Sequence, residues 1–474
     1  MNLTWCLPLA LLFSIQLRAQ NAYQINVTLK PFHSGFLYLA HYYGKKQLLI
    51  DSAAIGPDSR AVFKGKEKLS GGVYLVAFPK KDGWFEIIID KEQQFSINAD
   101  SADLLNKLSF TGSPDNETFK DYQKFTATTG SEINRLQQAY PKAKNKQDSA
   151  AIQAALLEKN KALKNYRLQF SKDHPRHLLT SIFTVLNEPQ IPANIKDSLG
   201  IYYYYRHHYW DGVNLTDARL IRTPVLQTKL DRYFDDVLPQ DPDTLKMEAD
   251  DIILKSRPDK DMYQYFLSQL TEKYVNPKYM GQDAVFVYLF QKYYVTGEAD
   301  GWMTEKYRKF IFDRGYSLMA NTIGDKAANI VMADTMDKPT PLYSIEAKYT
   351  VVCFWDPDCS HCQVEVPKLD SLYENKWKAS GVKIYGVMTS GVKESWLKYI
   401  KEHNLKDWVH VYQTEEMKSA ESASGKPGYK QLFDVYQTPM LYLLDKDKRI
   451  IAKKLNYEQL NDFLDYKLKS ASTN

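Results

Sequence analysis

The sequence predicts a multidomain protein in which an antiparallel β-sandwich is followed by an all-α domain and then by an α/β domain. Three observations support this fold class. The chain has 474 residues, which is too long for a single hydrophobic core. Strand-like alternation changes to helical periodicity near residue 113, and strands alternate with helices from residue 324. Its 44% hydrophobic and 25% charged residues are typical of a folded globular protein.

The amino-terminal sequence MNLTWCLPLALLFSIQLRAQ has the pattern of a signal peptide at residues 1–19. Its apolar run from Leu7 to Leu17 is too short to span a bilayer, and Ala19 suits a cleavage site. Cys6 starts the run, so cleavage would remove it. A buried strand is the alternative interpretation. Because no other stretch has about 18 consecutive apolar residues, we expect an exported protein without a transmembrane segment after cleavage.

Residues 20–112 are expected to form the β-sandwich. Short segments rich in aromatic and β-branched residues are separated by turn sequences such as GPDS, SGG and KKDG. The clearest segments are YQINVTL, GFLYLAHYY, GVYLVAF, WFEIIID and QFSINA. They indicate about seven strands, and this part of the chain shows no cluster of His, Cys or acidic residues that would form a site.

Residues 113–323 are expected to form the all-α domain. Apolar residues recur at helical spacings, and prolines then interrupt the pattern. The apolar residues include Ile152, Leu156, Leu163, Tyr166 and Phe170, and the prolines are Pro175, Pro239 and Pro258. The apolar segment 284–295 fits either a helix or a strand.

An aromatic run, IYYYYRHHYWDG at residues 201–212, stands out within this helical region. It fits a docking or ligand surface, and it also fits a tyrosine-rich helix packed between its neighbours. His207 and His208 are adjacent, so they cannot face one metal ion from a helix, where useful pairs are three or four residues apart.

Residues 324–474 are expected to form the α/β domain with a mixed central sheet. KYTVVCFW, GVKIYGVMT and WVHVY are strand-like, and helical segments lie between them. A polar loop is expected at QTEEMKSAESASGKPG. The segment MLYLLDKDKRIIAKKL predicts an antiparallel hairpin at one edge, and YEQLNDFLDYKLK predicts a final helix.

The charge and the cysteine content narrow the classes of function that fit this chain. Lys and Arg total 62 against 57 for Asp and Glu, and a net charge of +5 over this length argues against nucleic acid as a partner. After cleavage the chain would hold only Cys353, Cys359 and Cys362. Three clustered cysteines in an oxidising compartment are too few for a disulfide framework and therefore indicate chemistry.

The segment FWDPDCSHCQVEVPKL is the candidate site. A buried strand ends at Trp355, a turn follows, and Cys359 opens a helix, which is the context of a redox CxxC pair. The helix dipole contributes about 0.3–1 kcal/mol, so it lowers the pKa of Cys359 by less than about one unit. Further lowering needs backbone N–H groups and the imidazole of His361. Asp356 and Asp358 either raise the pKa of Cys359 or merely form the turn. The sign of the net shift in the pKa of Cys359 therefore stays open.

A metal site is the weaker alternative for these residues. One CxxC pair with His361 and Cys353 provides no second ligand pair at usable spacing for zinc. We therefore expect no metal and no cofactor beyond a redox-active Cys359–Cys362 disulfide.

The segments VVCFWDPDCSHCQVEVPKLDSLY and YQTPMLYLLDKDKRI together resemble the thioredoxin fold, and within it the exported thiol-disulfide oxidoreductases of the TlpA/ResA type. The resemblance covers residues 324–474. It implies that Cys359 is the attacking thiol and Cys362 the resolving thiol. It also implies that Glu365 assists proton transfer, although an acid there also suits the first turns of a helix. Thr438-Pro439 matches the cis-proline whose preceding residue hydrogen-bonds a partner chain.

Two positions depart from thioredoxin itself. Cys353 replaces a buried acid that helps to deprotonate the resolving thiol, so the usual base is missing, and a buried Cys most often acts as a small hydrophobe. Ser360-His361 replaces Gly-Pro, and a His before the second cysteine resembles the more oxidising relatives. The direction of electron flow therefore stays open.

The preceding domains resemble exported multidomain proteins of Gram-negative bacteria. The resemblance thus implies a periplasmic or cell-envelope location. It also implies protein thiols or disulfides as substrates and a redox partner, for which a membrane electron donor is one candidate. Disulfide exchange is the leading hypothesis for function. The alternatives are an assembly protein whose first two domains bind a partner, and a peroxiredoxin-type peroxidase, although Asp356 stands where peroxiredoxins have Thr or Ser.

Overall fold

The computed structural model describes residues 22–472, so the predicted signal peptide lies outside the described residues. The chain divides into two compact units, one ending at Val237 and the other beginning at Leu238. Across residues 22–472, no helix combines the length and the apolar character needed to cross a membrane. The domain boundaries drawn from the sequence stay predictions.

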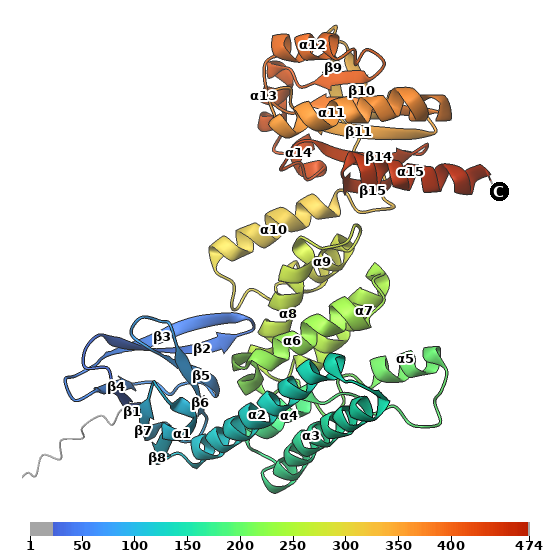
Figure 1. The fold of residues 1–474 in the computed structure, drawn as a ribbon. Coiled ribbons are helices and arrows are strands. Elements are labelled where there is room, and N and C mark those ends of the chain that lie inside the picture. Colours follow the sequence, from blue (N-terminus) through green and yellow to red (C-terminus); the bar gives the residue numbers. More distant parts are fainter. Residues whose placement is uncertain (1–21, 473–474) are drawn as a thin grey trace, which may run out of the picture. The chain divides into compact units, whose positions relative to one another are not determined.

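The first unit begins with two four-stranded sheets that enclose a common apolar core (Figure 1). The strand orders are β4-β1-β7-β8 and β3-β2-β5-β6. The strands are β1 (Tyr23–Lys30), β2 (Phe36–Tyr43), β3 (Lys46–Ala54), β4 (Arg60–Gly65), β5 (Gly72–Ala77), β6 (Trp84–Ile89), β7 (Gln94–Asp100) and β8 (Ser109–Thr111). Alternate residues of β1 are buried, as a strand with one face on a core requires.

This arrangement confirms the β-sandwich with two refinements. Within residues 22–112, the two sheets contain eight strands in place of about seven, because the short β8 pairs with β7. β1 and β7 run parallel, whereas the other strand pairs of the two sheets are antiparallel.

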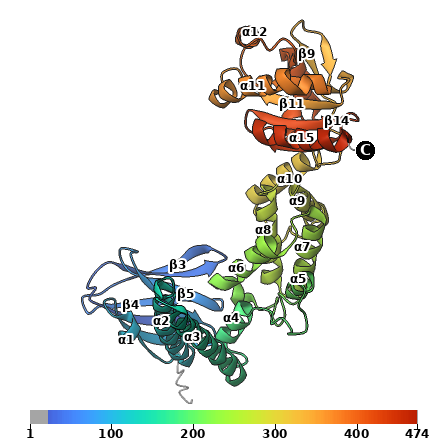
Figure 2. The ribbon, with the colours of Figure 1, turned by 45° about the vertical axis from the view of Figure 1, so that its right-hand side comes forward.

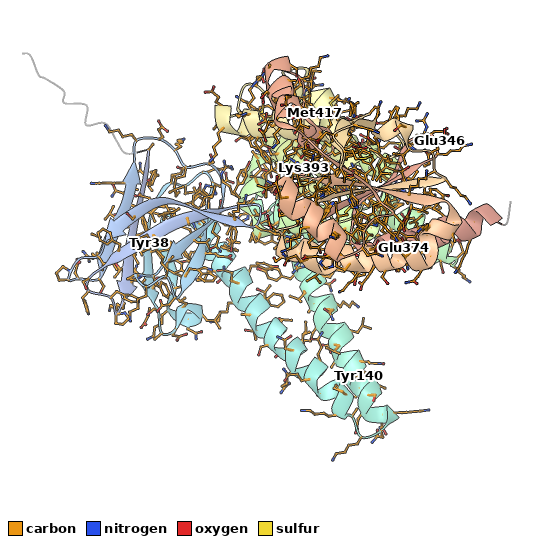
Figure 3. The ribbon with its side chains drawn as sticks, turned by 90° about the horizontal axis from the view of Figure 1, so that it is seen from above. Tyr38, Tyr140, Glu346, Glu374, Lys393 and Met417 are labelled. Carbon is orange, nitrogen blue, oxygen red and sulfur yellow. The ribbon has the colours of Figure 1, made fainter. Side chains whose placement is uncertain are left out.

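Helices make up the rest of the first unit. They are α1 (Leu104–Lys107), α2 (Pro114–Ala139), α3 (Lys146–Asp173), α4 (Leu178–Leu186), α5 (Ser198–His207) and α6 (Pro224–Arg232), followed by the π-helical turn Tyr233–Val237. The long α2 and α3 form a hairpin with Tyr140 at its turn (Figure 3). The aromatic run at 201–212 begins within α5, a helix without a fully buried side chain.

Four helices open the second unit (Figures 1 and 2). They are α7 (Pro242–Ser256), α8 (Lys260–Val275), α9 (Asp283–Leu289) and α10 (Glu305–Met319). The segment 284–295, which fitted helix or strand, is helical: α9 continues into the π-helical turn Phe290–Tyr294. The central region is therefore helical as predicted.

A seven-stranded mixed sheet follows, in the order β10-β9-β13-β12-β11-β14-β15. Its strands are β9 (Val331–Asp334), β10 (Pro339–Pro341), β11 (Tyr349–Trp355), β12 (Val382–Met388), β13 (Val409–Tyr412), β14 (Met440–Asp445) and β15 (Ile450–Leu455). β11 pairs with β12 in parallel and with β14 antiparallel. The β14–β15 hairpin forms one edge, as the sequence predicts.

Helices cover both faces of this sheet. They are α11 (Ser360–Leu372), α12 (Lys393–Glu402), α13 (Glu415–Ser424), α14 (Tyr429–Leu432) and α15 (Tyr457–Ser472). Side chains of α11, α12 and α15 pack on one face, and those of α14 pack on the other. Figure 2 shows α15 along the β14–β15 side of the sheet, which it contacts.

The prediction of a loop at 413–428 was wrong over most of its length, because this segment contains α13. Thr414 caps the helix by accepting a hydrogen bond from the Met417 N–H at 3.2 Å, and two acidic residues occupy the first turn. Gly425 ends it in the left-handed region. The helix has no buried residue, so it lacks the apolar stripe that helical periodicity requires.

Buried ion pairs join the helices of the second unit to its sheet. Lys453 of β15 is 3% exposed and pairs with Asp283, which opens α9. Its ammonium group also donates to the main-chain and side-chain oxygens of Asn321, at 2.7 and 2.9 Å. In a second cluster, buried Asp434 pairs with Arg314 of α10 and with Lys454 of β15.

Candidate active site

The candidate site lies directly after β11, at the carboxyl end of this strand of the seven-stranded sheet. Every residue from Thr350 to Trp355 is buried, so both faces of the strand are covered by other parts of the protein. The turn that follows is stabilised by Asp356, whose side chain accepts a hydrogen bond from the Asp358 N–H at 2.8 Å. The main-chain oxygen of Asp356 accepts from the Cys359 N–H at 3.2 Å. Asp356 thus has the turn-forming role that was one of its two predicted interpretations.

Cys359 occupies the position just before α11 and is partly exposed. Its sulfur donates a hydrogen bond to the main-chain oxygen of Thr438 at 3.4 Å, although the two residues are 79 positions apart. The Thr438–Pro439 peptide bond is cis, in agreement with the sequence prediction. The sulfur of Cys359 and the loop that carries Pro439 are therefore in direct contact.

The surroundings of Cys359 favour its thiolate. Partial burial raises the pKa of Cys359, but it is outweighed by hydrogen bonds from the Thr438 side chain and from the backbone and side chain of Cys362, with the backbone of His361 adding to them. The net pKa is lowered from its usual value of 9.0. This answers the question that the sequence left open, and the lowering comes from hydrogen bonding to the charged form.

The other two thiols lie in a less polar environment. Burial raises the pKa of Cys362 to about 12. Cys353 is completely buried, and burial raises its pKa well above the usual value, with the charges of Cys362 and Glu365 acting in the same direction. All three cysteines of the described chain are free thiols. A partly exposed thiol with a lowered pKa beside a buried thiol with a raised pKa suits unequal roles in disulfide exchange.

Alkylation should separate these thiols. At neutral pH we expect iodoacetamide to modify Cys359 first, because its lowered pKa and exposure give it the largest accessible thiolate fraction. Its rate should level off below pH 9.0, the usual thiol pKa, whereas Cys362 and Cys353 should stay unmodified. Peptide mass spectrometry after timed labelling at several pH values measures this order. Earlier labelling of Cys362 would contradict the assignment.

The structure places the supporting residues around this pair. Trp355 is buried at the end of β11, whereas Ser360 and His361 are exposed in the first turn of α11. Only the backbone of His361 contributes to the pKa of Cys359, so tuning by its imidazole stays a prediction. Glu365 is half-buried, and its charge reaches Cys353. Its part in proton transfer also stays a prediction.

Two groups at this end of the sheet were missed by the sequence reasoning. Ser390 in the loop after β12 donates a hydrogen bond to Asp356. His410 is buried in β13. The sequence contains a signal for each of them. Ser390 follows a strand that is parallel to β11, and the carboxyl ends of neighbouring parallel strands meet at one edge of a sheet. His410 is a lone histidine inside the apolar strand WVHVY, which is unusual.

Within residues 22–472, no three His, Cys, Asp or Glu side chains are grouped so that they could hold a metal ion.

Three parts of the chain match known protein families. Residues 323–454 match the AhpC/TSA family. Residues 23–119 and 136–313 match two domains of unknown function, DUF4369 and DUF5106 respectively.

Two curated relatives each align with 30% of the chain. The thiol-disulfide oxidoreductase ResA of Bacillus thuringiensis subsp. konkukian is 26% identical over 145 residues, which are 30% of this chain and 76% of that protein. ResA of Bacillus cereus has the same identity and coverage.

Two solved structures are similar to parts of this chain. A domain of a possible thiol-disulfide isomerase from Cytophaga hutchinsonii is 38% identical, with 97% of that chain and 32% of this one covered and a TM-score of 0.28. A thioredoxin-like protein from Bacteroides caccae is 21% identical, with 97% of that chain and 59% of this one covered and a TM-score of 0.46.

Proposed function

We propose, from the premise that residues 323–454 form a thioredoxin-like domain of the AhpC/TSA family related to ResA-type thiol-disulfide oxidoreductases, that Cys359 and Cys362 exchange disulfides with protein substrates. One observation carries the proposal. The exposed Cys359 has a lowered pKa and contacts the loop of the cis-proline, while the adjacent Cys362 is buried with a raised pKa. The enzyme class follows from the relatives, and the roles of the two residues are our assignment.

In the proposed reaction, the Cys359 thiolate attacks one sulfur of a substrate disulfide. A Cys359–substrate disulfide forms, and the other substrate sulfur leaves as a thiolate that takes a proton from water. Cys362 then loses its proton and attacks the Cys359 sulfur. The Cys359–Cys362 disulfide forms, and the second substrate sulfur leaves with the electron pair. The substrate has gained two electrons and two protons, and the reverse sequence oxidises a dithiol.

The setting of this reaction is part of the proposal. We propose that the protein acts after export, in the periplasm or at the cell envelope, where disulfides persist. A separate redox partner would then restore the starting state of the pair, and a membrane electron donor is one candidate. The relation to ResA supports thiol–disulfide chemistry, because the name of this relative is thiol-disulfide oxidoreductase, and a protein substrate is our proposal.

The reaction can be tested by trapping its intermediate. In Cys362→Ser the resolving thiol is missing, so the protein should accumulate as a stable mixed disulfide through Cys359. Non-reducing electrophoresis of cell-envelope extracts, followed by mass spectrometry, would detect the adducts and identify their partners. Cys353→Ser, which keeps both proposed redox thiols, is the matched control and should show few adducts. Equal adduct levels in Cys362→Ser and in the Cys359→Ser/Cys362→Ser double variant would refute the proposal.

A further inference from the structure

A cavity of about 390 Å³ lies within the second unit, where the loop between α8 and α9 meets the end of β15. The loop contributes Lys278, Tyr279 and Met280 to its lining, and β15 contributes Lys453 and Lys454. The backbone N–H of Lys453 donates a hydrogen bond to the sulfur of Met280 at 3.4 Å. The loop is therefore in direct contact with the strand, and the cavity is built jointly by the helices that precede the sheet and by the sheet itself.

A β-bulge brings two consecutive lysines to this cavity. Successive residues of a regular strand point to opposite faces of the sheet, yet Lys453 and Lys454 both line the cavity. Leu455 pairs with Leu441 and Lys453 pairs with Tyr442, so Lys454 is the extra residue between two positions of the ladder. Its φ of 58° lies in the left-handed region, which residues with a side chain rarely adopt. Bulges of this kind redirect a side chain and recur next to active sites.

Cationic groups outnumber anionic groups at the inner end of the cavity. The charge of Lys453 is matched by Asp283, with which it forms the buried ion pair described above. Lys454 and Arg314, by contrast, share the single carboxylate of Asp434. One positive charge therefore remains in excess beside β15.

The rim of the cavity adds a further cation and three large exposed side chains. Lys278 is exposed and lies 5.1 Å over the ring of Tyr279, and among residues 22–472 no carboxylate lies within ion-pair distance of it. Tyr279, Met280 and Tyr436 are 46%, 39% and 61% exposed. Tyrosine and methionine are enriched where proteins bind other chains. The rim therefore suits a peptide, and the excess positive charge suits an acidic one.

The cavity lies close to the redox pair. Tyr436, which lines it, is two residues before Thr438, whose main-chain oxygen accepts a hydrogen bond from the Cys359 sulfur. Two residues span at most about 7 Å, and both Tyr436 and Gln437 are exposed along this path. Leu455, which also lines the cavity, is paired with β14, and β14 is paired with β11. Two strand spacings amount to about 10 Å, which three or four extended residues can span.

We propose that this cavity binds an acidic segment of the protein substrate, three or four residues from the substrate cysteine that Cys359 attacks. A carboxylate of the segment binds between Lys278 and Lys454, and its neighbouring residues pack on Tyr436 and Tyr279. This inference rests on the proposed exchange reaction and names its substrate class, which is proteins with acidic residues near the reactive cysteine. The loop between α8 and α9 thereby selects substrates for the cysteines that follow it in the chain.

Peptide disulfides that differ only in charge test this inference. Each peptide has one cysteine, joined to the uncharged leaving group pyridine-2-thiol, and a pair of Glu or of Gln residues placed three and four positions before or after it. The Cys359 thiolate of the reduced full-length protein attacks the peptide sulfur, and the pyridinethiol leaves with the electron pair, so its absorbance gives the rate constant. In one placement the Glu peptide should react about tenfold faster than the Gln peptide at low salt. This advantage should shrink as salt screens the charges.

Substitutions at the cavity should remove this preference. The readout is the ratio of the Glu-peptide rate to the Gln-peptide rate, because the ratio cancels any general change in the reactivity of Cys359. In Lys278→Glu the ratio should fall to about one, since the added carboxylate repels the segment. Lys454→Gln, which removes the cation on the bulge, should lower the ratio to about half or less. Circular dichroism verifies that each variant is folded.

Lys446→Glu is the matched control, because it makes the same change of charge at an exposed lysine in the turn between β14 and β15. Its ratio should equal that of the wild type. The inference is wrong if the wild type shows no preference for Glu in either placement, or if Lys278→Glu and Lys446→Glu lower the ratio equally. It is also wrong if folded Lys278→Glu and folded Lys454→Gln both keep the wild-type ratio. If the wild type reacts with none of the peptides, the proposed exchange reaction fails instead.

Discussion

Cys359→Ser is expected to lower disulfide exchange to the rate of a blank without protein. The thiolate is the nucleophile in this chemistry, and Cys359 is the one cysteine in the described chain that combines exposure with a lowered pKa. A serine hydroxyl stays protonated at this position and cannot form a mixed disulfide. Reduction of a protein disulfide such as that of insulin, in the presence of a dithiol reductant, measures the rate.

Cys353→Ser is the matched control for this substitution. Cys353 is buried, and its raised pKa disfavours the thiolate, so this variant should keep most of the exchange activity once its folding has been verified. Exchange by Cys359→Ser at the wild-type rate would show that the chemistry lies elsewhere in the chain.

Asp283→Ala is expected to reduce the free energy of unfolding of the second unit by about 3–5 kcal/mol, the usual cost of breaking a buried ion pair on one side. Lys453 is 3% exposed and Asp283 is 4% exposed. Removal of the carboxylate would leave the ammonium group with the two oxygens of Asn321 as its partners, and its charge would be uncompensated. Urea unfolding followed by tryptophan fluorescence measures the change.

The matched control is Asp313→Ala, which breaks an ion pair with Lys309 on the surface of α10. Both of its side chains are largely exposed, so the loss should be about 0.5 kcal/mol or less. Equal losses for Asp283→Ala and Asp313→Ala would mean that burial of the Lys453–Asp283 pair contributes little.

The strand, turn and helix of the candidate site could be predicted because their signals are local. A buried run ending at Trp355, a turn sequence and a CxxC pair lie within a few residues of one another. The sign of the pKa shift of Cys359 could not be predicted in this way. It depends on Thr438, which is distant along the chain and is brought to the sulfur by the fold.

Two misjudged elements have a different cause. The helix α13 was predicted as a loop because it has no buried residue and thus no apolar periodicity. The direction of β7 relative to β1 was misjudged because parallel and antiparallel strands with one buried face show the same alternation. In both cases the deciding information is tertiary contact rather than local pattern.

The ion pair between Arg314 and Asp434 has a consequence for the enzyme as a whole. Arg314 belongs to α10, whereas Asp434 lies four residues before Thr438, whose main-chain oxygen contacts the Cys359 sulfur. A helix that precedes the seven-stranded sheet thereby holds the loop between α14 and β14. A protease cut or a gene break just ahead of residue 324 would spare both active-site cysteines but remove this anchor and the partner of Lys453. We therefore expect residues 324–474 to be less stable on their own than together with the helices that precede them.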